Sequence, residues 1–296
     1  MAVVNTNISA SVAQSALAKN ERALGKAMEQ LSTGSRINSA ADDAAGLAIS
    51  TRMTSQINGL NVGIKNAADG INMINTAEGA LIEVTNMLQR MRELALEASN
   101  GTTDVNDRTY LNKEYSALRD EIQRIATKTE WNGRAVLSNA ADGSSSGLVK
   151  YQIGVDPGTT LSVDFGNFTN NVASGTFYKF RDATVGSGAT ATSISAATTT
   201  AAQTTAATVV TEIDTALNTV NLKRAEFGAA SNRLTHTIDN LTNVVTNAES
   251  TRSQITDTDY AAATSELAKA QIIAQAGTAM LAQANQMPQT VLALLR

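Results

Sequence analysis

The side chains best suited to catalysis are scarce in this chain. Of its 296 residues one is a histidine, His236, and none is a cysteine. His236 stands in "RLTHTIDN" among apolar residues at helical spacing, which is typical of a surface or seam-edge position on a helix. The acidic pair Asp42-Asp43 opens a helical stretch, where carboxylates favour the positive end of the helix dipole. Ser39 stands three residues before Asp42, which is the sequence form of a capping box. We therefore expect no catalytic centre, no cofactor and no metal site, and hence no enzyme.

The chemistry that remains is recognition by charged and apolar side chains on a helix surface. The segment "QRMRELALEASNG", residues 89–101, continues a helical pattern but carries Arg90, Glu93 and Glu97 on an outer stripe. Leu94 lies one turn from Arg90, and we expect it to be exposed beside the guanidinium. An arginine next to an exposed leucine is a composition typical of interface anchors. The positions expected to face the core are Leu88, Met91, Ala95 and Ala98.

Composition and charge narrow the class of protein. Apolar residues make up 43% of the chain but aromatic residues only 4%, so the apolar content suits narrow helix–helix seams better than a wide core. The net charge of −4 argues against nucleic acid as a partner. No apolar run approaches the length of a membrane-spanning helix. The first residues, "MAVVNTNISASVAQ", lack the basic and apolar regions of a cleaved secretory signal, which by itself favours a cytoplasmic protein.

Apolar residues recur every seventh position at both ends of the chain, which predicts a helical seam at each end. The alanine-rich seams bury little area each, so we expect both terminal helices to be disordered in the free chain and to fold when they find partners. The predicted seam residues are Leu17, Leu24 and Leu31 near the N-terminus, and Leu267, Ala274 and Leu281 near the C-terminus.

Between these ends the sequence predicts further helices and one hairpin. Periodicity predicts one helix over residues 43–99 and a second that starts near residue 111 and ends near 130. Alternating residues in "LVKYQIGVD" and "TLSVDFGNF", joined across Pro157-Gly158, predict a β-hairpin in the one region with strand character. Residues 183–208 are almost all Ala, Ser, Thr and Gly and predict a surface loop, either unmodified or carrying O-linked sugars. Helical periodicity then returns over residues 213–255.

Together these elements predict a mainly α fold. We expect an elongated antiparallel helical bundle or coiled coil with paired N- and C-terminal helices and a small β-hairpin region. Residues 1–43 and 255–296 are expected to form an inner terminal coiled-coil domain. Residues 44–166 and 206–254 are expected to form a rod-shaped helical domain with the hairpin, and residues 167–205 a short variable surface insertion.

Four segments resemble bacterial flagellin, and they occur in the family's order at both ends of the chain. The resemblance covers about residues 1–165 and 205–296 and is closest to the minimal flagellins that lack large outer domains. It implies a structural subunit that polymerises into a helical filament and has no catalytic activity. The segments are "LSTGSRINSAADDAAGLAIS" (31–50), "LQRMRELALEASNG" (88–101), "NGRAVL" (132–137) and "LAQANQMPQTVLALLR" (281–296).

The same resemblance implies a location and partners. It places the protein in the extracellular flagellar filament used for swimming, exported without a cleaved signal peptide, which reverses the cytoplasmic interpretation. It implies a cytoplasmic export chaperone that holds residues 255–296, and contacts with the filament cap and hook-junction proteins. It also implies recognition of the free subunit by Toll-like receptor 5, although packing against the next subunit is the first expected role of the same stripe. The receptor-binding positions carried over are Gln89, Arg90, Leu94 and Glu114.

Two alternatives remain open at this point. A hook–filament junction protein shares the terminal domains of the filament subunit. An unrelated coiled-coil adhesin or signalling rod also has heptads, but lacks the matched terminal segments and does not polymerise. Electron microscopy of purified protein after seeding distinguishes a filament subunit from such a rod.

Overall fold

The chain divides into two compact units. One unit contains residues 1–58 and 245–296, and the other contains residues 59–244. The first unit extends further along the chain at both of its boundaries than the terminal domain expected from the sequence. The computed structural model describes residues 7–138, 147–168, 194 and 199–294.

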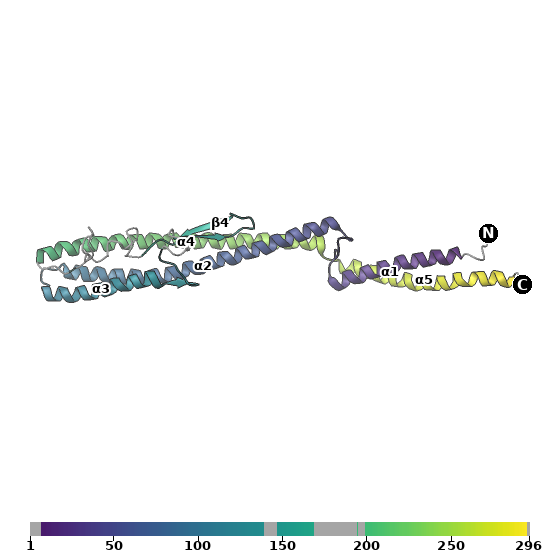
Figure 1. Ribbon diagram of the computed structural model, residues 1–296, viewed down its shortest axis with the longest axis horizontal. Helices are drawn as coiled ribbons and strands as arrows, with labels where there is room; N and C mark the ends of the chain where they lie inside the picture. The colour runs from purple at the N-terminus through teal and green to yellow at the C-terminus, as the bar shows by residue number, and fades with distance from the viewer. Residues whose placement is uncertain (1–6, 139–146, 169–193, 195–198, 295–296) are drawn as a thin grey trace. The chain divides into compact units, whose positions relative to one another are not determined.

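The first unit contains the helices α1 (Ile8–Thr33) and α5 (Tyr260–Leu294), which lie side by side (Figure 1). α1 begins where the side-chain oxygen of Asn7 accepts a hydrogen bond from the backbone N–H of Ala10 at 3.0 Å. It ends at Gly34, whose φ of 71° lies in the left-handed region that glycine adopts without strain. Residues 8–33 and 260–294 are therefore helical in the structure, and the two helices pair with each other.

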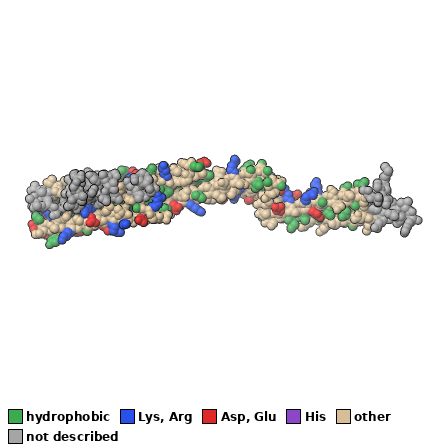
Figure 2. Space-filling model, viewed as in Figure 1, with side chains coloured by type: hydrophobic (Ala, Val, Ile, Leu, Met, Phe, Trp, Pro, Cys, Tyr) green, Lys and Arg blue, Asp and Glu red, His purple; other side chains and the backbone are tan. Residues whose placement is uncertain are grey.

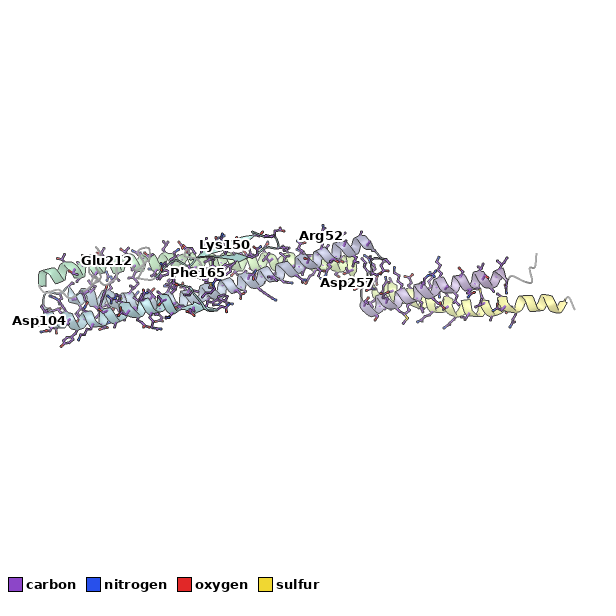
Figure 3. The ribbon with its side chains drawn as sticks, in the orientation of Figure 1. Arg52, Asp104, Lys150, Phe165, Glu212 and Asp257 are labelled. Atoms are coloured by element: carbon purple, nitrogen blue, oxygen red, sulfur yellow. The ribbon has the colours of Figure 1, made fainter. Side chains whose placement is uncertain are left out.

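The turn after α1 holds the C-terminal end of α4 (Thr199–Thr256), within the same unit. The guanidinium of Arg36 donates to the carbonyl oxygen of Ile255 at 2.6 Å, and the Arg36 backbone N–H donates to Thr256 at 2.7 Å. In return the backbone N–H of Thr258 donates to the Gly34 oxygen at 2.9 Å. These bonds satisfy carbonyl groups that the end of a helix leaves without partners. Asp257, labelled in Figure 3, lies in the short link between α4 and α5.

The N-terminal cap of α2 (Ala44–Ala98) differs from the predicted capping box. The Asp43 carboxylate accepts from the backbone N–H of Gly46 at 2.9 Å and is the cap. Asp42 instead accepts from the backbone N–H and the hydroxyl of Ser39, both at 3.1 Å, in the turn before the helix. The sequence pattern therefore marked the correct turn, but the capping box places the N-cap at Ser39, four residues before the observed cap Asp43.

The second unit is built from three helices that lie side by side: most of α2, α3 (Val105–Lys128) and the first part of α4 (Figure 1). The predicted single helix over residues 43–99 is confirmed by α2. The core of the unit draws side chains from all three helices and from the hairpin. Phe165 lies inside this core with its ring centroid 5.3 Å from that of Phe227 on α4 (Figure 3).

Two small antiparallel hairpins complete the second unit. β3 (Leu148–Gln152) pairs with β4 (Thr160–Asp164), as predicted from the alternating sequence, and every second side chain of the pair is buried. A second hairpin, β1 (Glu130–Trp131) with β2 (Arg134–Ala135), was not predicted. Its turn residues Asn132 and Gly133 have φ values of 51° and 75°, the conformation of the two-residue turns that Asn-Gly favours. The prediction of a single region with strand character is therefore wrong, while the mainly α fold with a small β region is confirmed.

The low-complexity tract at 183–208 is only partly described. α4 begins at Thr199, so the last ten residues of that tract are helical rather than part of a loop. Residues 183–193 and 195–198, and with them most of the predicted insertion at 167–205, lie outside the described residues. Ile194, between those two stretches, is fully buried.

The β3–β4 hairpin packs directly on the backbone of α2. A Cβ atom at Gly63 would lie 2.5 Å from the carbonyl oxygen of Ile153 in the loop after β3, so only glycine permits this approach. One turn further, the Asn66 side chain donates to the Gln152 oxygen at 2.8 Å. The Tyr151 hydroxyl donates to the sulfur of Met73 at 3.1 Å.

Candidate interaction surfaces

The charged stripe of α2 forms a defined surface together with α3. The Nε of Arg90 donates to Glu114 on α3 at 2.8 Å, and Nη1 donates to Glu93 on α2 at 3.0 Å. The hydrogen bond to Glu114, followed by that to Glu93, raises the pKa of Arg90 above its usual value. Gln89 is exposed beside this group. We call the surface of Gln89, Arg90, Glu93 and Glu114 the Arg90 surface.

The Arg90 surface is exposed and preformed. Side-chain exposure is 49% for Arg90 and 47% for Glu114, so both charges face solvent while holding each other in position. Exposed ion pairs of this kind contribute little to stability because water screens both charges. Their main effect here is to fix the direction of the Arg90 guanidinium. The N–H groups that do not bond to Glu114 or Glu93 remain available as hydrogen-bond donors to a binding partner.

Leu94 does not belong to this surface, contrary to the prediction that it is exposed beside Arg90. It is fully buried in the core of the second unit. The reason is that α2 packs against two helices rather than one. Arg90 pairs with α3, while Arg92 pairs with Asp214 of α4 at 2.7 Å, so the buried stripe between them is wider than the four predicted positions. The exposed leucine on this helix is Leu96, one turn beyond Arg92.

A buried arginine that the sequence analysis missed holds the turn next to this surface. Arg108 of α3 is fully buried, and its Nε donates to the Ala98 oxygen at 3.1 Å. Its Nη2 donates to the Asn100 oxygen at 3.2 Å. A cation at the C-terminal end of α2 also opposes the negative end of that helix dipole. The sequence could not identify Arg108, because a single polar residue in the first turn of a helix does not change the spacing of the apolar residues.

The facing sides of α1 and α5 carry small and polar residues among the leucines. The Asn20 side chain donates to the Ala270 oxygen of α5 at 2.7 Å, and the Asn7 side chain donates to the Ala284 oxygen at 2.8 Å. Ala270 and Ala284 are buried, so the backbones approach closely enough for these bonds. The six seam residues named from the sequence are half-buried along this face: Leu17, Leu24, Leu31, Leu267, Ala274 and Leu281.

Away from that seam, the terminal helices expose apolar side chains (Figure 2). Ile8 and Val12 of α1 are 63% and 64% exposed, and Met280 of α5 is 64% exposed. These three residues line a groove of about 560 Å³ between the two helices. Contiguous exposed apolar surface of this kind marks interaction sites in soluble proteins.

The residues considered for chemistry take other roles. His236 is exposed on α4. Asp42 forms an ion pair with Lys26 at 2.8 Å, and that hydrogen bond lowers the pKa of Asp42 from 3.8 to about 2. Among the described residues no group of acidic or histidine side chains is arranged to hold a metal ion. Over the same residues, no helix is long and apolar enough to cross a membrane.

Comparisons with known proteins identify the family. The model of the bacterial flagellin N-terminal helical region matches residues 4–142, and that of the bacterial flagellin C-terminal helical region matches residues 210–295. The chain belongs to the bacterial flagellin family. A flagellin of Halalkalibacterium halodurans is 41% identical over 294 residues, covering 99% of this chain and 100% of the relative. A flagellin of Bacillus subtilis is 42% identical over 306 residues, covering 99% of each. The crystal structure of Bacillus cereus flagellin has a TM-score of 0.45 at 31% identity and covers 60% of this chain and 88% of that one.

Membership in this family fixes the broad function. This flagellin is a structural subunit that self-assembles into the extracellular filament of the bacterial flagellum, and it is not an enzyme. The matched relatives are flagellins over nearly their whole length, which favours the filament subunit over an unrelated coiled-coil adhesin or signalling rod.

Proposed function

We propose that subunits pack in the filament through two surfaces, the terminal helical pair and the Arg90 surface, and that Toll-like receptor 5 binds the Arg90 surface of the free subunit. The observation that carries the proposal is the exposed, preformed ion pair between Arg90 and Glu114. An arginine held by carboxylates on two sides presents its remaining donors in a fixed direction, which lowers the entropy lost on binding. Leu94 is not part of this proposal because it is buried.

The proposal is tested by Arg90→Ala, with Arg124→Ala as the matched control. Arg124 is also an exposed, ion-paired arginine of the second unit, but its partner Glu121 lies on the same helix. We expect Arg90→Ala to raise the subunit concentration needed for half-maximal receptor activation by about tenfold or more, since arginine anchors carry a large share of interface energy. Equal responses of the two variants would exclude the receptor site.

The same two variants test the overlap of the two roles. If the Arg90 surface is also a subunit contact, Arg90→Ala raises the critical concentration for seeded polymerisation while Arg124→Ala does not. Normal polymerisation of Arg90→Ala would confine the surface to receptor binding and leave subunit packing to the terminal pair.

We further propose that the C-terminal segment, residues 255–296, is the part held by a cytoplasmic export chaperone before assembly. The exposed apolar residues of α5 support this, because Ile272, Ile273 and Met280 need cover in an unassembled chain.

The filament cap and hook-junction proteins are proposed to contact the terminal pair, and export is proposed to leave the N-terminal segment uncleaved. The mass of the secreted protein shows whether the N-terminal segment is left uncleaved. Binding of the chaperone is tested with Ile272→Ser, which should lose it. The control is Val155→Ser, a substitution at an exposed residue of the β3–β4 hairpin, which should still bind.

A further inference from the structure

The groove between α1 and α5 contains a side chain that can be reversibly modified. Met280 is 64% exposed and forms one wall of the groove. We propose that Met280 is a methionine oxidation site at which peroxides switch the subunit from an assembling to a non-assembling form. The remaining residues that line the groove are Ile8, Ser9, Val12, Ala13, Ala16, Gln283 and Ala284.

Solvent access makes the modification selective. Met280 and Met28 are 64% and 55% exposed, whereas Met73 and Met91 are 2% and 0% exposed. The sulfur of Met73 also accepts a hydrogen bond from the Tyr151 hydroxyl, which occupies one of its two lone pairs. Because oxidation of methionine follows exposure of its sulfur, a dissolved peroxide reaches Met280 and Met28 before the buried pair.

The reaction needs only the peroxide as co-reactant. A lone pair of the Met280 sulfur attacks one oxygen of hydrogen peroxide, the O–O bond breaks, and the hydroxide that leaves takes up the proton of the transferred oxygen. The products are one methionine sulfoxide and one water; sulfur is oxidised and the peroxide is reduced. The sulfoxide is returned to the thioether by methionine sulfoxide reductases, so the modification is reversible.

The functional effect follows from the polarity of the product. The groove is lined mainly by Ile8, Val12 and three alanines, and its side-chain hydrogen-bond donors are those of Ser9 and Gln283, so most of the surface facing a sulfoxide oxygen is apolar. A polar group buried without a partner weakens a contact by about tenfold or more. This step rests on the proposed packing of subunits through the terminal pair, which would cover the groove. It also implies that assembly protects Met280, so the modification acts on free subunits.

The experiment uses purified full-length subunits treated with hydrogen peroxide, followed by peptide mapping by mass spectrometry and by seeded polymerisation. Met280→Leu keeps an apolar side chain that peroxide cannot oxidise, and Met28→Leu is the matched control at an exposed methionine outside the groove. We expect Met280 and Met28 to be oxidised while Met73 and Met91 are not. Treated wild type and treated Met28→Leu should show a critical concentration raised by about tenfold or more, treated Met280→Leu should polymerise as before, and the reductase should restore the wild type.

Several outcomes separate this inference from the function on which it rests. Oxidation of Met28 without oxidation of Met280, or equal loss of polymerisation by treated Met280→Leu, would refute the switch alone. Equal oxidation of Met280 in free subunits and in preformed filaments would show that assembly leaves the groove open, and would also refute it. If untreated wild type failed to polymerise, the assembly role itself would be wrong, and the switch with it.

Discussion

Substitution of Gly63 by alanine tests how the hairpin is held on α2. An alanine Cβ at this position would lie 2.5 Å from the Ile153 oxygen and 3.0 Å from its carbonyl carbon. Both atoms belong to backbone, so no side-chain rotation relieves the contact. The loop after β3 must move away from α2, and the hydrogen bond from Asn66 to Gln152, one turn along the helix, is strained with it.

The expected destabilisation can be estimated from these contacts. Overpacking of this kind costs about 1 to 3 kcal/mol, and loss of the Asn66 hydrogen bond costs about 1 kcal/mol more. The higher helix propensity of alanine returns about 0.5 to 1 kcal/mol. The net loss is therefore about 1 to 3.5 kcal/mol. At Gly79 of the same helix a Cβ would meet no atom within 4 Å, so Gly79→Ala should stabilise the unit by about 0.5 to 1 kcal/mol.

The assay is urea unfolding followed by the fluorescence of Trp131, the single tryptophan of the chain, which lies in the second unit. Gly63→Ala should lower the midpoint and Gly79→Ala should raise it. A double-mutant cycle with Asn66→Ala adds a check, since Asn66→Ala should cost less in the Gly63→Ala background than in the wild type. If the two glycine variants have the same stability, the close packing of the hairpin on α2 is wrong.

Three further predictions concern single polar side chains. The pKa of Asp42 is lowered to about 2 by Lys26, so its ion pair stabilises the fold at neutral pH and this contribution is lost as the pH falls from about 4 to about 2. The difference in thermal midpoint between wild type and Asp42→Asn should therefore be full at pH 7 and vanish near pH 2; a constant difference would exclude the linkage. Asn20→Ala removes the hydrogen bond to Ala270 and should weaken the terminal pair by about 1 kcal/mol, read as lower helicity on heating by circular dichroism. Arg108→Met removes the donor of the buried Ala98 carbonyl and of the partly buried Asn100 carbonyl and should destabilise the second unit by about 2 kcal/mol, read as a lower urea midpoint.

Periodic features of the fold could be predicted from the sequence because they depend on spacing alone. The seven-residue repeat of apolar residues predicted the terminal helices, and helical periodicity predicted the ends of α2 to within one residue. The expectation that both terminal helices are disordered in the free chain stays a prediction, which circular dichroism of free subunits against filaments can check. The seam between them buries mainly alanines, such as Ala27 and Ala270, which is consistent with a weak pair.

The remaining features depend on contacts between distant segments, which one sequence does not reveal. Leu94 was misplaced because its burial depends on a second neighbouring helix, and nothing within α2 states how many helices will surround it. Arg108 gave no signal because its partners are carbonyl groups of the backbone. The β1–β2 hairpin was overlooked although its Asn132-Gly133 turn was readable, since strands of two residues show no alternation.

The hydrogen bonds between α1 and α5 also affect the order of folding. Asn7 and its acceptor are separated by 277 positions, and Asn20 and its acceptor by 250. Closing a loop of that length is slow relative to local contacts, so this pairing forms last. It also cannot begin before α5 has been synthesised. The first helix of a growing chain consequently lacks its α5 partner until the end of translation, and the chain can be passed on in extended form before the two helices pair.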